Sequence, residues 1–120
     1  MEKIILKKYL PTQSHNYFNG RLEGKDTRTS LQLDIKDKNK EEITFYINKG
    51  LVGMNVSFFL GLFSKTILEY GVEDFKKRYV FEYEDENTKK LFEKDMEYGI
   101  KAVLREITPK NLLERLRGNN

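Results

Sequence analysis

"SFFLGLFSKTILEYG", residues 57–71, is rich in apolar residues and carries no charge from residue 57 to residue 64. Apolar side chains recur every three or four positions, at Phe59, Phe63, Ile67 and Tyr70. This spacing is typical of one face of an α-helix. Gly71 follows the last of them, where helices often end in a left-handed residue. The stretch therefore predicts a largely buried helix around which the rest of the fold is arranged.

The segment that leads into this helix carries no charge from residue 50 to residue 64, although 34% of the chain is charged. Asn55 or Ser57 can cap the helix, because their side chains accept hydrogen bonds from first-turn amides. Val52 and Met54 precede the helix in a predicted turn. An exposed apolar turn often marks a contact site. The competing interpretation is that the turn folds over the end of the core.

Strands are predicted on both sides of the helix. Apolar and polar residues alternate over residues 43–47 and again over residues 79–83, which is the period of a half-buried strand. The intervening residues are numerous enough for a right-handed parallel crossover. The clearest local pattern of the chain is the alternation of residues 31–35 and of residues 43–47 on the two sides of the polar stretch DKNKEE, which predicts an antiparallel hairpin over residues 31–47.

Weaker patterns complete the expected fold. Residues 4–6 predict a first strand that ends before Pro11, and residues 11–24 predict a loop or a short edge strand. A helix is expected from Asn87 onward, with a short third helix after Thr108-Pro109. Together these elements predict one α/β domain, bordering on α+β, over residues 1–120. Its small mixed β-sheet would carry an N-terminal antiparallel hairpin and two or three helices on one face.

The composition narrows the classes of function. The chain of 120 residues has no cysteine and one histidine, His15, which argues against thiol catalysis, a disulfide framework and a zinc site of His and Cys. We therefore expect no catalytic residues, no metal and no cofactor. The uncharged segment is shorter than the roughly 20 apolar residues that span a bilayer. A cytoplasmic protein with no membrane partner is the expectation.

The C-terminal half carries a family resemblance. A serine and a phenylalanine open the helix at residues 57–58, the helix ends in glycine, and the run FKKR at residues 75–78 leads into a strand. The following segment, ENTKKLFEKDMEYGI at residues 86–100, begins a helix with Lys-Lys-Leu. These features resemble the STAS-like family of small bacterial proteins, which are related to the anti-sigma-factor antagonists.

The resemblance implies a regulatory module without enzymatic activity that docks on a protein partner. In the anti-sigma-factor antagonists that partner is a kinase of the histidine-kinase ATPase type, and phosphorylation of a serine in an Asp-Ser-Ser-Gly type motif switches the docking. Ser57 matches the switched serine by position, whereas Asn55, Val56 and Phe58 replace the other motif residues. A plain capping role for Ser57 is the competing interpretation. The implied partner-binding residues are Val52, Met54, Asn55, Val56, Ser57 and Phe58.

The alternative is a small basic protein that associates with nucleic acid, although we favour a protein partner. The net charge is only +3, from 22 basic and 19 acidic residues. Lys76, Lys77 and Arg78 would contact phosphates, with Arg115 and Arg117 as further candidates. An open sheet edge at the first strand or the hairpin could also pair with a second copy to form a homodimer.

Overall fold

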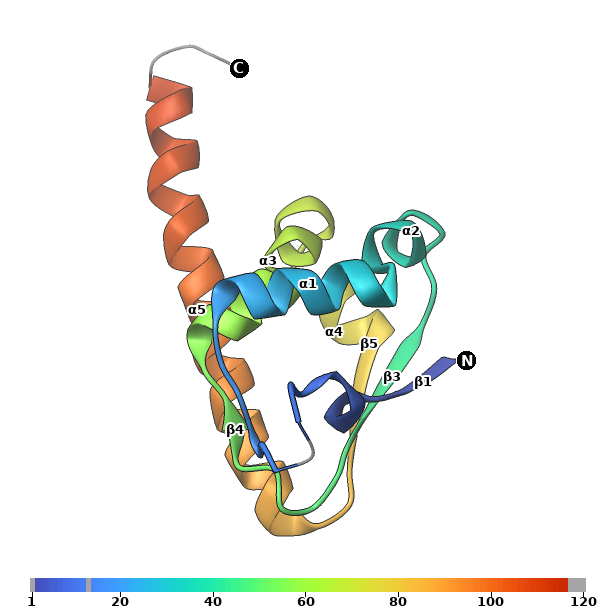
Figure 1. Cartoon of the computed structure of the whole chain (residues 1–120). Coiled ribbons are helices and arrows are strands. Elements are labelled where there is room, and N and C mark those ends of the chain that lie inside the picture. Colours follow the sequence, from blue (N-terminus) through green and yellow to red (C-terminus); the bar gives the residue numbers. More distant parts are fainter. Residues whose placement is uncertain (1, 13, 117–120) are drawn as a thin grey trace.

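The computed structural model describes residues 2–12 and 14–116, with side chains placed up to residue 106 (Figure 1). Its main sheet has three strands in the order β1 (Glu2–Ile5), β3 (Ile43–Ile47) and β5 (Tyr79–Tyr83). All pairings in this sheet are parallel. The α/β class is therefore confirmed, but the described sheet is parallel and not mixed.

The remaining elements are named here in chain order. They are η1 (Leu6–Tyr9), β2 (Tyr17–Phe18), α1 (Arg21–Leu31), α2 (Leu33–Lys38), β4 (Gly53–Met54), α3 (Val56–Tyr70), α4 (Val72–Arg78) and α5 (Glu86–Leu116). The predicted crossover between residues 43 and 83 is confirmed, because α3 and α4 connect the parallel strands β3 and β5. In the described part of the chain, no helix is both long enough and apolar enough to span a bilayer.

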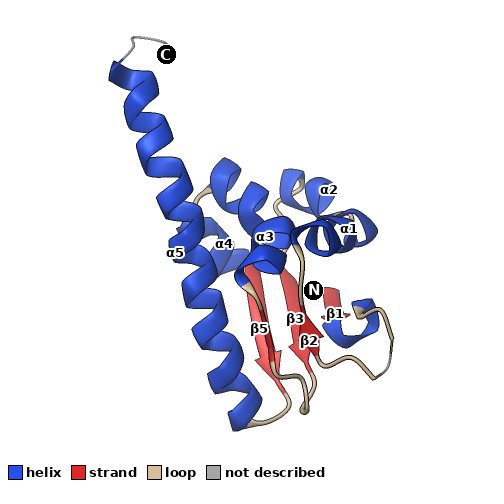
Figure 2. Ribbon diagram, turned by 60° about the vertical axis from the view of Figure 1, so that its left-hand side comes forward, coloured by secondary structure: helices blue, strands red, loops and turns tan. Residues whose placement is uncertain are grey.

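Aromatic side chains fill the space between the sheet and α3. The Phe45 ring stacks on Phe81 with a centroid distance of 5.3 Å, and Phe63 of α3 meets Phe45 edge-on at 5.5 Å. On the opposite face of the sheet, an exposed ion pair joins Lys3 to Glu82 at 3.0 Å. Helix α3 therefore packs on one face of the sheet, as predicted, but the described residues form five α-helices and not two or three (Figure 2).

Glycines allow the helices to approach one another closely. A Cβ atom on Gly24 of α1 would lie 2.3 Å from the carbonyl oxygen of Phe58, and one on Gly61 of α3 would lie 2.2 Å from the carbonyl oxygen of Arg21. The backbones of α1 and α3 thus touch where the two helices cross. A Cβ atom on Gly99 of α5 would similarly lie 2.3 Å from the Phe59 ring. These contacts fix α3 between α1 and α5.

The predicted hairpin over residues 31–47 is wrong. Residues 31–38 are almost entirely helical, and the left-handed residue Gln32, with φ of 56°, separates α1 from α2. The reversal at Gln32 buries both Leu31 and Leu33 but leaves Ile35 exposed, so the apparent alternation came from a helix break. Both sides of β3 are moreover taken by β1 and β5.

The expected third helix after Thr108-Pro109 is also wrong, because α5 runs without interruption from Glu86 to Leu116. A Thr-Pro pair suits a helix start, since proline lacks the N–H that a first-turn residue leaves unbonded. Inside a helix the same residue removes one backbone hydrogen bond. Here the helix continues through Pro109 despite that loss.

Candidate functional site

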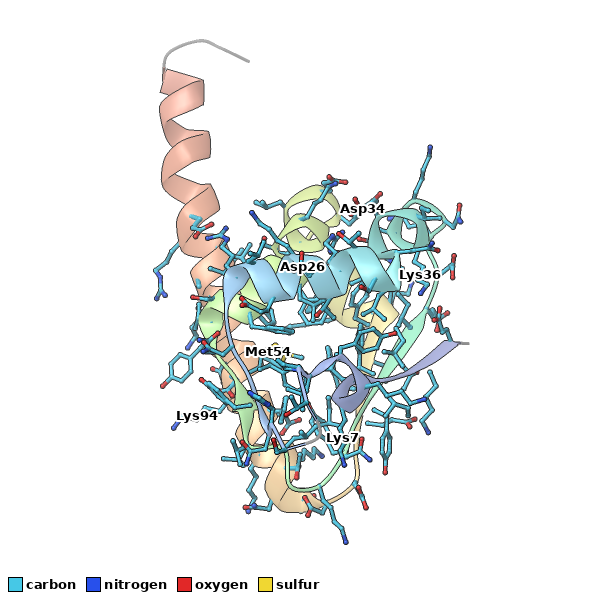
Figure 3. All side chains as sticks on the ribbon, viewed as in Figure 1. Lys7, Asp26, Asp34, Lys36, Met54 and Lys94 are labelled. Atoms are coloured by element: carbon cyan, nitrogen blue, oxygen red, sulfur yellow. The ribbon has the colours of Figure 1, made fainter. Side chains whose placement is uncertain are left out.

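The turn that enters α3 is held by backbone hydrogen bonds on two sides. The Val52 N–H donates to the Asn16 carbonyl oxygen at 2.8 Å, next to the parallel pairing of β4 with β2. On the other side, the Met54 N–H donates to Asp95 Oδ2 of α5 at 2.9 Å. The turn is therefore a fixed part of the fold that lies between β2 and α5 (Figure 3).

Asn55, not Ser57, caps α3. Its Oδ1 accepts a hydrogen bond from the Phe58 N–H at 2.9 Å, and its Nδ2 donates to the side-chain oxygen of Asn19. Ser57 is the second residue of α3 and its side chain is exposed. The capping role that the sequence also allowed for Ser57 is therefore wrong, which leaves its hydroxyl available at the surface.

The predicted partner-binding residues divide into two groups. Met54 and Phe58 are 1% and 2% exposed, and the Phe58 ring packs against Phe18 at a centroid distance of 5.2 Å. These two side chains belong to the core and cannot contact a partner. Val52 and Val56, in contrast, are 46% and 38% exposed. Among these four apolar residues, Met54 and Phe58 therefore belong to the core, and Val52 and Val56 belong to the surface.

An exposed aromatic residue extends this surface. Tyr17 of β2 pairs with Gly53 of β4, and its side chain is exposed. No local sequence pattern could have identified Tyr17, because long-range strand pairing brings it to the turn. The resulting surface, here called the entry patch, comprises Tyr17, Val52, Val56 and Ser57.

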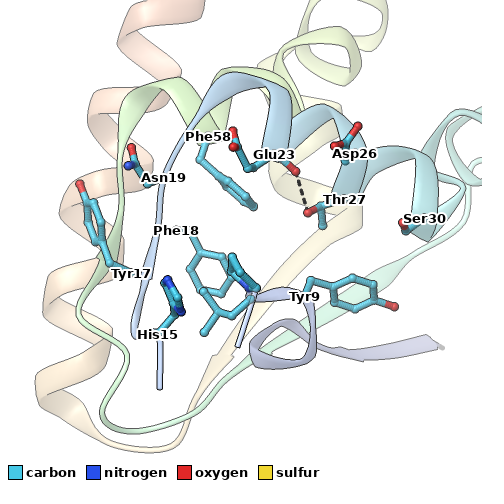
Figure 4. A pocket seen from close by; sticks show the side chains of 12 residues that line it. Tyr9, His15, Tyr17, Phe18, Asn19, Glu23, Asp26, Thr27, Ser30 and Phe58 are labelled. Atoms are coloured by element: carbon cyan, nitrogen blue, oxygen red, sulfur yellow. Dashed lines mark hydrogen bonds between the residues drawn. The ribbon is translucent and has the colours of Figure 1, made fainter. Parts of the chain in front are cut away.

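A cavity of about 380 Å³ lies between α1 and the segment that leads into β2 (Figure 4). Phe18 and Phe58 contribute aromatic walls, while Glu23 and Asp26 contribute carboxylates. His15 also lines it, with Nδ1 2.6 Å from Thr12 Oγ1. The carboxylates would disfavour an anionic ligand. Among the residues that the structure describes, no three His, Asp or Glu side chains are placed to hold a metal ion.

A buried ion network, which the sequence did not predict, lies beside the C-terminal half of α3, at Thr66. Asp37 of α2 is 1% exposed and accepts hydrogen bonds from Tyr79 Oη and Thr66 Oγ1, each at 2.6 Å. Its two oxygens also bind Arg28 at 3.0 Å and Arg78 at 3.2 Å. Burial, reinforced by the hydrogen bond to Asp37, raises the pKa of Tyr79 well above its ordinary value. The network connects α1, α2, α3 and β5.

The three candidate phosphate contacts, Lys76, Lys77 and Arg78, do not lie on one surface, because the buried network binds Arg78. Lys76 and Lys77 are exposed, but Arg78 is buried and bound by Asp37 and Asp74. The guanidinium is therefore neutralised inside the protein and does not form a basic surface with the two lysines. The side chains of Arg115 and Arg117 lie outside the described residues.

Comparison of the chain with protein-family models, with curated proteins and with solved structures found no match.

Proposed function

We propose that the chain is a STAS-like regulatory module without enzymatic activity, and that its entry patch binds a protein partner. The observation that carries this proposal is the exposure of Val52 and Val56 on a turn whose backbone is bonded to both β2 and α5. The surrounding segment, residues 50–64, has no charged residue. A preformed, uncharged and partly apolar surface suits a protein contact, because it loses little hydration and little conformational freedom on binding.

The exposed position of Ser57 supports a phosphorylation switch at this surface. A phosphoserine at the second residue of α3 would lie at the positive end of the helix dipole, an interaction worth about 0.3–1 kcal/mol when exposed. Phosphorylation would therefore leave the fold intact. It would also add a charge of about −1.5 to −2 beside Val56, which would weaken an apolar contact there. A histidine-kinase-type ATPase is the partner that the family resemblance suggests.

The test is a titration of the purified protein with such an ATPase from the same genome. Val56→Asp should weaken binding at least about tenfold, which corresponds to about 1.4 kcal/mol, and Ser57→Glu should act in the same direction. Leu68→Asp is the matched control, because Leu68 is an exposed apolar residue of α3 outside the entry patch. All three variants should unfold at temperatures close to that of the wild type. Equal loss of binding in Val56→Asp and Leu68→Asp would contradict the proposal.

A further inference from the structure

The sheet has an open edge at β5, and α5 runs alongside that edge (Figure 2). Between them lies a groove of about 730 Å³. One wall is formed by β5 and the end of α4, and the other by α5. The groove is on a different side of α5 from the entry patch, since Asp95 faces β4 while Met96 and Ile100 line the groove.

The backbone of β5 can accept another strand in this groove. The Glu84 N–H donates to the Ile47 carbonyl oxygen at 2.9 Å, so this amide faces β3. Backbone groups alternate sides along a strand, so the N–H and C=O groups of Phe81 and Tyr83 point away from β3. An extended chain beside β5 could therefore form ladder hydrogen bonds with both residues.

The groove is lined mainly by apolar side chains, and its charged lining residues are Lys76, Glu93, Glu97 and Lys101. Phe81 is half-buried against Phe45, and Met96 and Ile100 line the groove from α5. Because α5 returns antiparallel to β5, the two ends of the groove differ. Lys76 lies at the end where β5 begins, and Glu93 lies at the end where β5 finishes.

Two further observations place Glu93 at the end of the groove where β5 finishes. The Tyr83 ring contacts Phe92, the neighbour of Glu93, at a centroid distance of 6.4 Å. Burial, together with the nearby Glu93 carboxylate, raises the pKa of Tyr83 to about 12. At the first end, Lys101 of α5 lines the groove with Lys76 and is paired with Glu97 on its own helix at 3.3 Å.

We propose that this groove binds an extended peptide segment of a partner protein, which adds to β5 as an antiparallel fourth strand. Antiparallel pairing is slightly more stable per residue than parallel pairing. The N-terminal end of an antiparallel segment would lie beside Glu93, and its C-terminal end would lie beside Lys76. Because opposite charges attract, the recognised peptide has a basic N-terminal end, apolar residues in the middle and an acidic C-terminal end.

This inference goes beyond the entry patch and does not depend on it. The two surfaces use different residues, so loss of one binding activity can be measured while the other is retained. A synthetic peptide with the sequence of residues 76–86, KKRYVFEYEDE, has the required order of charges and serves as the probe. The same peptide with every charge inverted is its matched control.

The experiment measures binding of both peptides to the full chain by fluorescence anisotropy. The native-charge peptide should bind saturably and at least tenfold more tightly than the inverted one. The double variant Lys76→Glu/Glu93→Lys should reverse this preference. Lys77→Glu should keep it, because Lys77 is exposed but does not line the groove. Circular dichroism of each variant establishes that the fold is retained.

Hydrogen exchange locates the bound peptide. Saturating peptide should slow the exchange of the Phe81 and Tyr83 amides at least tenfold and leave the amide of Val52 unchanged. The proposal is overturned if binding of neither peptide saturates by about 1 mM or if both peptides bind with equal affinity. It is likewise overturned if the peptide slows exchange at other amides and not at those of Phe81 and Tyr83. It is also overturned if the chain alone forms a dimer that protects Phe81 and Tyr83, because a second copy would then occupy the edge.

Discussion

Replacing Asp37 with asparagine should destabilise this protein far more than the loss of one surface charge would. Asp37 is 1% exposed and is bound by Arg28 and Arg78 at 3.0 and 3.2 Å. It also accepts the hydroxyl hydrogens of Thr66 and Tyr79, each at 2.6 Å. Asparagine keeps the shape and one oxygen acceptor but removes the negative charge that compensates two buried guanidinium groups.

The expected loss follows from the cost of leaving a buried charge without its partner, which is about 3–5 kcal/mol. We expect the lower value, because the amide oxygen retains part of the hydrogen bonding and Asp34 and Asp74 still pair with the two arginines. An unfolding entropy of roughly 2.1 cal/mol/K per residue over 120 residues converts about 3 kcal/mol into a decrease of about 12 °C in Tm.

The assay is chemical and thermal unfolding of Asp37→Asn beside Asp34→Asn. Asp34 binds the same Arg28 at 2.9 Å, but its side chain is 59% exposed. An exposed pair of this kind contributes at most about 1 kcal/mol. If the free energy of unfolding decreases equally in the two variants, the buried network does not hold α2 to α3 and β5. That result would refute the reasoning.

Three further perturbations test the fold around the proposed sites. Asn55→Ala should cost about 1 kcal/mol because it removes the cap of α3, whereas Ser57→Ala should change the unfolding free energy by less than about 0.5 kcal/mol; a larger effect of Ser57 in urea unfolding would restore it as the cap. Gly61→Ala should cost about 1–3 kcal/mol, because its Cβ would lie 2.2 Å from the Arg21 carbonyl oxygen; equal or higher thermal stability would contradict the close crossing of α1 and α3. The hydrogen bond from Arg78 holds the pKa of Asp74 below its usual value, so their pair stabilises the fold above about pH 4 and this contribution is lost as pH falls through the lowered pKa. Asp74→Asn should thus destabilise the protein at pH 7, and this difference should shrink as the pH falls through the lowered pKa of Asp74; a difference that does not depend on pH would contradict this assignment.

Part of the fold could be predicted because it is encoded by local patterns. The apolar spacing of residues 57–71 and the alternation of residues 79–83 each report one element and its buried face, and both elements are confirmed. The parallel crossover followed from the number of residues between two strands. The hairpin failed because two buried leucines on either side of Gln32 imitate a strand when a left-handed residue joins two helices.

The candidate site was only half predictable for a similar reason. The sequence located the uncharged turn, but the order of residues within the turn did not indicate which side chains face the core. Pairing of β4 with β2 and the hydrogen bond from Met54 to Asp95 bury Met54 and expose Val52. The same long-range contacts bring Tyr17 to the turn, and they join residues that are distant in the chain.

The sequence by itself determined the α/β class, the buried helix α3 and the strands that flank it, since hydrophobic periodicity reflects which face of an element leaves water. Only the tertiary structure decided that Asp37 neutralises two arginines, that Gly24 and Gly61 meet, and that β5 remains an open edge. These features depend on distances between segments that local propensity does not encode. They also determine which surfaces remain free to bind a partner.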